Sequence, residues 1–572
     1  MEKEKVKPET KAKCKEIIKM IILFMALSIF ACQPYLNDMM IYTHDFGYHL
    51  NRIIQISDNL KEGIFPSFIH SGLLKNLGYA NSIFYPEIFL YIPAFMMFVL
   101  RNLHVLNAYK LFLIIITFFT FISTYISAKG IFKKKEIAYL ASVLYGFSLY
   151  RLTDVYVRGA LGEILSFIFI PLIFYGLYEI LFGENKKWWI ISIALWGIAN
   201  SHVLTFVLLL PVIVLICLLN IDKLFKDKSR LKNIVIAAVV SVILCIGFFG
   251  PMLEQKANDK FYIDGESIES SEVLAERATS LSMALGSKMK FGYAVSSTLR
   301  NDGMSEGIGA VLLILGMLIF VRKDISYKEN RFEIQMFVIA AVIYFMTTSL
   351  FPWKSISFLN VIQFPFRLNF IPTILLTLVG ASNFYYIIKE ENRRDICILF
   401  IIGLLIANGY VLSNVKLNFN PDIYQKFEDL IEGIDHETGS SEYLPVNSDV
   451  DDLELYNIND KDKTIDFERN RSTIWFDYEN EEDDLEINIP LIYYKGYQAK
   501  IVDKDNNETK LIVEKNEENG HVLVRSDEKL TGTITVYYKA TVVQIISYTI
   551  GLTSFIVLII YIIDKEKKEK NK

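Results

Sequence analysis

NIVIAAVVSVILCIGFFG, residues 233–250, decides the fold, because this apolar run contains no charged side chain. As a helix it is long enough to cross a bilayer core of roughly 30 Å. LFLIIITFFTFIS, residues 111–123, is a second such run, and the 572-residue chain is 52% hydrophobic. A soluble chain of this length would form several domains. The runs instead predict a polytopic α-helical membrane protein.

Positive charges predict how the chain is oriented in the membrane. Short loops rich in Lys and Arg stay on the cytoplasmic side. Such loops occur at 129–136, 183–187, 221–233, 321–331 and 389–395, and both the N-terminus and the tail 564–572 are basic. The segments between these loops then face outward. We expect about twelve crossings, an uncleaved first helix, and both termini in the cytoplasm.

This alternation places a condition on two of the apolar segments. Residues 84–101, which contain Pro86 and Pro93, cannot cross fully, because the next basic loop would then lie outside. We expect a re-entrant or interfacial helix there. Residues 188–220 must instead cross twice, with a turn near Asn200–His202, because basic loops flank them on both sides.

Residues 413–541 have a different pattern from the rest of the chain. Alternating polar and apolar residues occur in STIWFDYEN, LEINIPLIYY, YQAKIVDKD, TKLIVEKN, HVLVRS and TGTITVYYKA, separated by turn residues such as Asn519-Gly520 and Thr531-Gly532. Strands at this spacing predict a small antiparallel β-sandwich. The region lacks cysteine, so no disulfide framework is expected. We therefore divide the chain into a membrane domain (1–412), an outer β domain (413–541) and an anchor with a basic tail (542–572).

THDFGYHLNRI, residues 43–53, concentrates polar side chains after the first apolar segment: His44, Asp45, His49 and Arg52. At helical spacing, Asp45, His49 and Arg52 share one face. Three interpretations are open. The stretch could be a solvated loop with one ion pair, a metal site, or the catalytic edge of an enzyme working at the membrane surface.

YRLTDVYVRGALGE, residues 150–163, is a second polar stretch between hydrophobic segments. It carries Arg151, Asp154, Arg158 and Glu163. Asp154 and Arg158 are four residues apart and could simply pair on a helix. The same alternation of charges could also bind phosphate while holding a carboxylate ready.

Three further segments carry single candidates. NSHVLTF places His202 at the turn of the double crossing, where it could be structural. VIQFPFRLNF contains Gln363 and Arg367, and this arginine could fork onto phosphate or extend to lipid headgroups. PMLEQK contributes Glu254 as the weakest signal. Ionisable groups at membrane mouths are functional candidates, and all five segments lie on the predicted outer side.

These stretches, together with LGYANSIFYPEIFLYIPA, IQFPFR and EYLPV (442–446), resemble a bacterial membrane family labelled "6-pyruvoyl-tetrahydropterin synthase-related". The layout is also similar to GT-C glycosyltransferases, including YfhO-type proteins. That resemblance implies a GT-C-like fold, a polyprenyl-phosphate sugar donor, and a catalytic base in the first outer loop, the position of Asp45. His44 stands where the resemblance implies the second residue of an acidic pair, so the resemblance leaves open whether a divalent metal takes part.

The function that follows is transfer of a lipid-linked sugar to a cell-envelope glycan or polymer. The expected catalytic side chains are Asp45, His44, His49, Asp154, Glu163 and His202, and the expected donor phosphate-binding side chains are Arg52, Arg158, Arg367 and Gln363. Membrane lipids are expected partners. The sequence has no Walker loop, so no nucleotide cofactor is expected. No nucleic-acid partner is expected either. The alternatives are a lipid or glycan transporter or flippase, and a non-catalytic envelope assembly scaffold.

Overall fold

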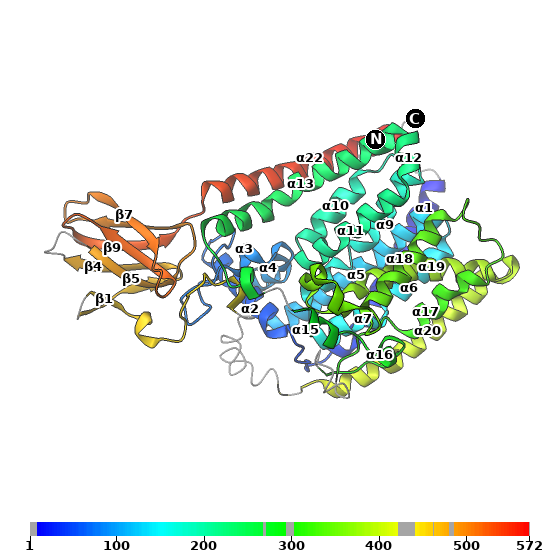
Figure 1. The fold of residues 1–572 in the computed structure, drawn as a ribbon, viewed down its shortest axis with the longest axis horizontal. Coiled ribbons are helices and arrows are strands. Elements are labelled where there is room, and N and C mark those ends of the chain that lie inside the picture. Colours follow the sequence, from blue (N-terminus) through cyan, green and yellow to red (C-terminus); the bar gives the residue numbers. More distant parts are fainter. Residues whose placement is uncertain are drawn as a thin grey trace, which may run out of the picture.

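The protein is a helical bundle with a β-sheet beyond one of its ends (Figure 1). The computed structural model describes residues 8–266, 270–292, 303–420, 422, 441–460, 463–479 and 485–570. The main helices of the bundle are α1 (Pro8–Ala31), α5 (Val105–Phe132), α6 (Lys135–Gly146), α8 (Leu161–Ser166), α9 (Ile170–Leu181), α10 (Trp189–Ala199), α11 (Val203–Leu219), α12 (Ile221–Lys226), α13 (Lys228–Asn258), α17 (Ala310–Met317), α18 (Arg331–Thr347), α19 (Phe370–Ile387), α20 (Arg393–Val415) and α22 (Val542–Lys570).

Several of these helices are suited to a bilayer. Within the described residues, six helical spans are long and apolar enough to cross a membrane: Val105–Phe132, Leu161–Leu181, Lys228–Asn258, Pro365–Ile387, Glu390–Asn418 and Val542–Glu569. Four shorter apolar helices accompany them. The prediction of a multispanning helical protein is therefore supported by helix length and composition, and the count of twelve crossings stays a prediction.

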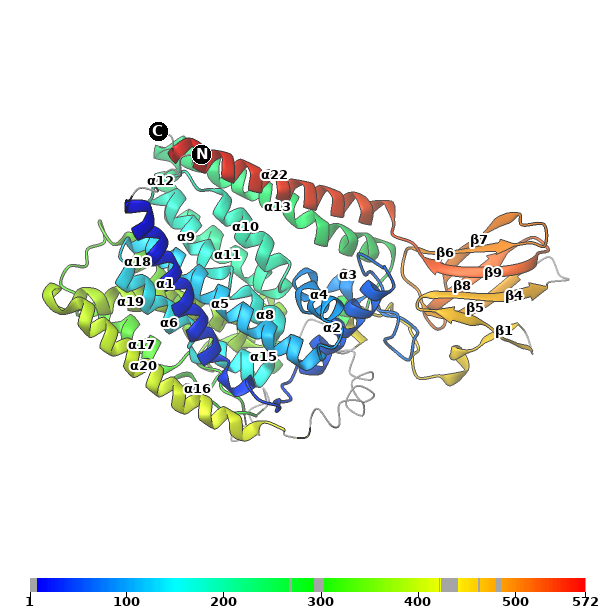
Figure 2. The ribbon, with the colours of Figure 1, turned by 180° about the vertical axis from the view of Figure 1, so that it is seen from behind.

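The basic loops gather at one end of the bundle. Lys135, after α5, forms an ion pair of 3.6 Å with Glu16 of α1. The Lys186 carbonyl accepts a hydrogen bond from Lys565 of α22, and the Asn185 side chain donates to Ser229 over 3.0 Å. The described ends of α1 and α22 lie close together at this end, far from the β-sheet (Figures 1 and 2). Basic segments that the charge pattern assigns to one side of the membrane thus lie together at one end of the bundle.

Segment 84–101 contains no helix long enough to cross a bilayer. It consists of a short turn and α4 (Tyr91–Val99), whose nine residues rise about 14 Å, half of a typical hydrocarbon core. On either side of it the chain is at the same end of the bundle, because Lys110 near the start of α5 donates to the Asn37 carbonyl beyond α1 over 2.7 Å. In both views α4 lies between the bundle and the β-sheet, next to α2 (Phe46–Lys61) and α3 (Asn81–Phe84).

The C-terminal strands form one sheet. They are β3 (Glu468–Asn470), β4 (Thr473–Glu479), β5 (Leu485–Ile492), β6 (Tyr497–Val502), β7 (Glu508–Lys515), β8 (His521–Ser526) and β9 (Thr531–Tyr538), with a separate pair of β1 (Ile458–Asp460) and β2 (Lys463–Ile465). The order is β3-β4-β9-β6-β7-β8-β5, antiparallel throughout. The first half of β7 pairs with β6 and the second half with β8, so the sheet coils into a half-barrel.

The predicted sandwich is therefore wrong in architecture, although all six quoted strand patterns form strands. One further detail differs. Gly532 lies inside β9 rather than in a turn, and a Cβ there would overlap the Val502 carbonyl. The glycine lets two strand backbones approach closely. The proposed domain boundary at 412/413 falls inside α20, which continues to Val415, and residues 423–440 lie outside the described part of the chain.

The β-sheet is fastened to the membrane helices and to the segment after α2. One hydrophobic cluster joins strand residues such as Phe476 and Ile487 to Phe68 and Phe84. At the end of α13, the amide of Gln255 donates to the Lys495 carbonyl over 2.8 Å and accepts from the Lys495 N–H over 3.0 Å. Helices α13 and α22 run side by side toward the sheet (Figures 1 and 2).

Candidate functional site

A cavity of about 900 Å³ opens where the bundle meets the sheet-bearing end. Its lining residues are Tyr42, Thr43, His44, Asp45, Tyr48, His49, Phe84, Tyr85, Arg158, Ala160, His202, Val203, Leu204, Val207, Met252, Lys256, Ile263, Asp264, Val361, Gln363, Arg367, Glu442 and Tyr443. Seven side chains singled out from four separate stretches of sequence meet here: His44, Asp45, His49, Arg158, His202, Gln363 and Arg367. Their chemical roles are taken up as proposals below.

Asp45 stands at the start of α2, on a loop held by backbone hydrogen bonds. The His44 N–H donates to the Val157 carbonyl over 3.1 Å, and the Asp45 N–H donates to the Arg158 carbonyl over 2.8 Å. Asp45 occupies the N-cap position, but its carboxylate does not cap the helix. Among the described residues it accepts no hydrogen bond and forms no ion pair, although it lines the cavity. A carboxylate placed in this way is available to a ligand.

Two glycines let the separate stretches come together. Gly159 has φ +64°, and a Cβ there would overlap the Thr43 hydroxyl and lie 2.8 Å from the Thr43 Cβ. A Cβ on Gly162 would lie 2.7 Å from the Ser201 carbonyl and would overlap the Tyr85 hydroxyl. The RGALGE stretch thus packs, without side chains at these points, against the Asp45 loop, Tyr85 and the His202 turn.

Arg158 ends a short π-helical segment, η3 (Asp154–Arg158), a backbone form that is frequent at functional sites. Its guanidinium binds Asp154 and lies 2.8 Å from Glu163. The Tyr150 hydroxyl donates to the other Glu163 oxygen over 2.5 Å. Asp154 and Glu163 therefore lie behind the cavity wall and compensate the charge of Arg158. The simple Asp154–Arg158 pair considered from the spacing does form.

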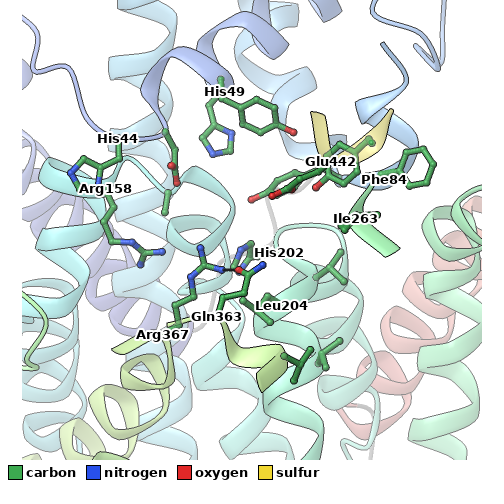
Figure 3. Close-up of a pocket in the computed structure, with 18 of the residues that line it drawn as sticks. His44, His49, Phe84, Arg158, His202, Leu204, Ile263, Gln363, Arg367 and Glu442 are labelled. Carbon is green, nitrogen blue, oxygen red and sulfur yellow. Dashed lines mark hydrogen bonds between the residues drawn. The ribbon is translucent and has the colours of Figure 1, made fainter. Parts of the chain in front are cut away.

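Arg367 has a different environment. Its guanidinium donates to the Gln363 side-chain oxygen over 2.5 Å, lies over the Phe364 ring at 5.2 Å, and leaves its buried Nε without a partner. No carboxylate within 4.0 Å pairs with it in the described chain. Gln363 has φ +62°, a strained backbone form for a residue with a side chain. A cation is thus held at the cavity beside a neutral amide. Figure 3 shows Arg158 and Arg367 directed toward the same side of the cavity.

The three cavity histidines are held neutral by burial. Burial lowers the pKa of His202 to about 4, lowers the pKa of His49 well below its ordinary range, and lowers the pKa of His44. The His202 Nδ1 is 2.8 Å from the Thr205 hydroxyl at the start of α11. The His49 Nδ1 is buried and has no hydrogen-bonding partner among the described residues. Neutral imidazoles can hydrogen-bond a substrate but do not supply charge.

Burial also changes the acid–base behaviour of Asp45. Burial raises the pKa of the Asp45 carboxyl, and the nearby Arg158 and Arg367 oppose that rise without reversing it. A carboxylate made more basic in this way is a better proton acceptor than an exposed one.

A family model described as "Family of unknown function (DUF6541)" matches residues 4–359, more than half of the chain. This chain belongs to the DUF6541 family. The matched part contains His44, Asp45, Arg158 and His202, while Arg367 lies beyond it. The pterin-synthase-related label expected from sequence is not the one that this family carries.

Two individual proteins resemble this DUF6541 member. An uncharacterized protein of Lactococcus lactis subsp. cremoris (strain MG1363) is 22% identical over 351 residues, which is 58% of this chain and 54% of that protein. The chain therefore spans about half the length of that relative. The cryo-EM structure of the arabinofuranosyltransferase AftD from mycobacteria is similar with a TM-score of 0.45 and 13% identity, covering 74% of this chain and 29% of the other.

One expected phosphate ligand of this DUF6541 protein is not brought to the cavity. Arg52 is buried on α2 and donates to the Tyr85 and Pro86 carbonyls over 3.0 and 2.7 Å, with Glu87 at 3.8 Å. These contacts fix the chain after α3, so we leave Arg52 out of the proposed site. Its position in sequence does not reveal this, because its partners are 33 or more residues away.

Glu254, the weakest candidate, also does not line this cavity. It accepts a hydrogen bond from the Thr541 hydroxyl over 2.5 Å and lies 3.6 Å from Lys495. Its role in the structure is to join α13 to the β-sheet. Within the described residues, no group of three or more His, Cys, Asp or Glu side chains is arranged to hold a metal ion.

The sequence analysis of this DUF6541 protein missed the wall opposite the arginines. Glu442 and Tyr443 come from the chain leading to the β-strands, and Lys256 and Asp264 come from the end of α13 and the turn after it. Figure 3 shows Glu442 across the cavity from Arg158 and Arg367. The EYLPV stretch was noticed only for its resemblance. Its place in the cavity depends on contacts with residues far away in sequence, such as the hydrogen bond between Tyr443 and Tyr79, which are 364 residues apart.

Proposed function

We propose that this protein is a membrane glycosyltransferase that moves a sugar from a polyprenyl-phosphate donor to a cell-envelope acceptor. The observation that carries the proposal is that one carboxylate and one guanidinium, both open to a ligand, line the same cavity. Within the described residues, Asp45 presents a carboxylate without a hydrogen-bonding partner, and Arg367 presents a guanidinium without a carboxylate partner. Held apart on the same cavity, they fit a reaction that needs a base and an anion site.

An apolar path supports a lipid-linked donor. Val203, Leu204 and Val207 of α11 line the cavity. Val207 is 42% exposed and continues along one helix face into Leu210, Val214 and Leu218, which are 37%, 55% and 57% exposed. A polyprenyl chain would lie along this exposed apolar face in the bilayer, with its phosphate at the arginines.

The residues then take the following roles. Asp45 removes the proton from the acceptor hydroxyl as that oxygen attacks the sugar. Arg367, oriented by Gln363, stabilises the charge on the leaving polyprenyl phosphate, a contribution of about 3 kcal/mol for one well-placed donor. Arg158 donates hydrogen bonds at the same side of the cavity, and Asp154 and Glu163 position its guanidinium.

The neutral imidazoles complete the proposed site. His202 and His49 hydrogen-bond the bound sugar or acceptor, and His44 flanks the base. Because burial holds all three neutral, their part is orientation rather than charge stabilisation. The chemistry needs no oxidant or nucleotide.

The proposed topology follows the positive charges. The basic loops gathered at one end would be cytoplasmic, and the cavity and β-sheet at the other end would lie outside the cell. About twelve crossings, counting the shorter apolar helices, and two cytoplasmic termini complete this arrangement. Residues 542–572 would anchor the outer β region 413–541.

The test is an Asp45→Asn variant. We expect transfer of labelled sugar from a polyprenyl-phosphate donor in membranes to fall about 10²- to 10⁴-fold, normalised to inserted protein. Asp58→Asn, on the same helix but outside the cavity, is the matched control and should transfer normally. Transfer by Asp45→Asn at the wild-type rate would remove Asp45 from the mechanism. Movement of the lipid-linked sugar across the bilayer without transfer would favour a flippase instead.

A further inference from the structure

The chain reverses sharply at Gln363, one of the residues that line the cavity. Gln363 has φ +62° and ψ −49°, and the Phe364 N–H donates to the Ile362 carbonyl over 2.7 Å. This three-residue form is a γ-turn with a positive φ, which is rare and strained for a residue with a side chain. We call residues 362–364 the Gln363 turn. Such a turn persists only where contacts from the rest of the structure hold it.

The Gln363 turn affects the site because its side chain orients a cation. The Gln363 side-chain oxygen accepts a hydrogen bond from Arg367, and Figure 3 shows the two side chains together at the cavity. The turn fixes the direction in which the Gln363 side chain leaves the backbone. The contacts that hold the turn therefore also set the position of the Arg367 guanidinium.

Arg277, at the end of α15 (Ser271–Glu276), contacts the backbone of this turn. Its guanidinium donates to the Gln363 carbonyl over 3.3 Å. That carbonyl and the Phe364 N–H belong to one peptide unit, so both polar groups of this unit are bonded, one to Arg277 and the other to Ile362. The unit cannot rotate about ψ of Gln363 without losing a hydrogen bond. Arg277 is not among the described residues that line the cavity.

The Phe364 ring connects the two arginines. The Arg277 guanidinium lies over this ring at 4.5 Å from its centroid, and the Arg367 guanidinium lies over it at 5.2 Å. A cation near an aromatic face is attracted by the electrons of the ring. Arg277 therefore contacts the turn at two points, the Gln363 carbonyl and the Phe364 ring, and both points also contact or orient Arg367.

Helix α15 is itself fixed to the segment that leads into the turn. The Ser271 hydroxyl donates to the Asn360 side-chain oxygen over 3.0 Å. Leu274 is fully buried in a hydrophobic cluster that also contains Trp353 and Ile362. The backbone that carries Arg277 is thus ordered by these contacts, and the hydrogen bond to the turn requires little further ordering.

We propose that Arg277 is a positioning residue for the anion site: it holds the Gln363 turn so that Gln363 directs Arg367 toward the donor phosphate. This inference rests on the proposed function and adds a residue that the sequence analysis did not single out. Arg277 acts through the turn and takes no part in proton removal by Asp45. Its loss lets the peptide after Gln363 rotate, the amide leaves the Arg367 guanidinium, and the phosphate is bound more weakly.

The experiment measures phosphate binding apart from transfer. The full-length protein in phosphatidylcholine nanodiscs is titrated with farnesyl phosphate, a short isoprenyl phosphate, and the heat of binding gives Kd. We expect Arg277→Met to raise Kd about tenfold, because the hydrogen bond and the ring contact are both lost. Arg277→Lys keeps a cation that can reach the carbonyl, so it should recover part of the affinity. Arg277→Gln should weaken binding as Arg277→Met does, and it replaces that variant if Arg277→Met does not insert.

Arg393→Met is the matched control. Arg393, at the start of α20, also donates to a backbone carbonyl, that of Ile388, over 3.1 Å, and its guanidinium lies 4.9 Å from the centroid of the Tyr385 ring. It is not among the described residues that line the cavity. Loss of the same two kinds of contact at Arg393 should therefore leave Kd for farnesyl phosphate at the wild-type value.

A double-mutant cycle with Gln363→Ala separates positioning from a general loss of stability. Gln363→Ala removes the amide that orients Arg367 and should itself weaken binding. Since Arg277 acts through Gln363, adding Arg277→Met to Gln363→Ala should raise Kd less than about twofold further. A merely structural role would instead give losses that add.

The outcomes separate this inference from the proposed function. Wild-type Kd in both Arg277→Met and Arg277→Gln, or fully additive losses in the cycle, would overturn the positioning role of Arg277. Failure of the wild type to bind farnesyl phosphate would overturn it together with the anion site. Binding that depends on Arg277, in a protein whose Asp45→Asn variant transfers normally, would overturn the proposed base and leave this inference standing.

Discussion

Replacement of Gly159 by alanine tests whether close packing at RGALGE builds the cavity. Its φ of +64° costs a residue with a Cβ about 1–2 kcal/mol. The new methyl would also overlap the Thr43 hydroxyl, and overpacking of this kind costs about 1–3 kcal/mol more. The loop that carries Asp45 is hydrogen-bonded to the backbone of residues 157–158, so a shift of this segment moves the loop as well. A displacement of about 1 Å at a catalytic group can cost about 10²-fold in rate.

Gly63 provides a matched control for this change. Its φ is +74°, and a Cβ there would meet nothing within 4 Å, so Gly63→Ala carries the backbone cost without the overlap. Thermal unfolding of both variants in detergent, followed by intrinsic fluorescence, should show a larger loss for Gly159→Ala. Adding Thr43→Ala should restore part of that loss. Equal losses for the two glycines, or no recovery with Thr43→Ala, would refute the packing argument.

Two further predictions concern charge. Arg367→Lys keeps the positive charge but loses the two-pronged guanidinium, so we expect KM for the donor to rise about tenfold. Arg52→Lys, outside the cavity lining, should lower thermal stability and leave that KM unchanged. A raised KM for Arg52→Lys with a normal KM for Arg367→Lys would exchange the roles of the two arginines. For pH, Asp45 must be ionised to act as a base, so kcat/KM should fall as pH drops through an Asp45 pKa that burial raises above its ordinary value. Burial lowers the pKa of His202 to about 4, so His202→Asn should leave this fall of kcat/KM at acid pH in place. If the fall disappeared in His202→Asn, it would belong to the histidine and not to Asp45.

The parts of the fold that follow from local patterns could be predicted. Apolar runs and basic loops identified the membrane helices and their grouping, because hydrophobicity and charge act over neighbouring residues. Alternation located the strands from Thr473 to Tyr538. The half-barrel could not be predicted, because it depends on β7 changing partners halfway, between Leu511 and Ile512. That choice is made by distant strands and leaves no local pattern.

The same division holds for the candidate site. Asp45, Arg158, His202 and Arg367 were identified because a polar residue beside an apolar segment is unusual. Arg52 has the same signature, and only contacts far along the chain show that it binds backbone carbonyls. Glu442 lies in a polar region where an acidic residue is ordinary, so nothing in the local sequence separates it from its neighbours.

The far wall of the cavity comes from the late part of the chain, and this has a consequence for biosynthesis. A nascent chain that has been inserted as far as Arg367 already contains Asp45, Arg158 and Arg367, but it lacks segment 442–446 and the sheet that contacts this segment. Chains emerge from the N-terminus onward, so this wall of the cavity is completed last. Under the proposed function, a chain truncated after α20 would keep Asp45 and the two arginines but would lack the wall that segment 442–446 contributes, so it would bind the lipid-linked donor without transferring its sugar.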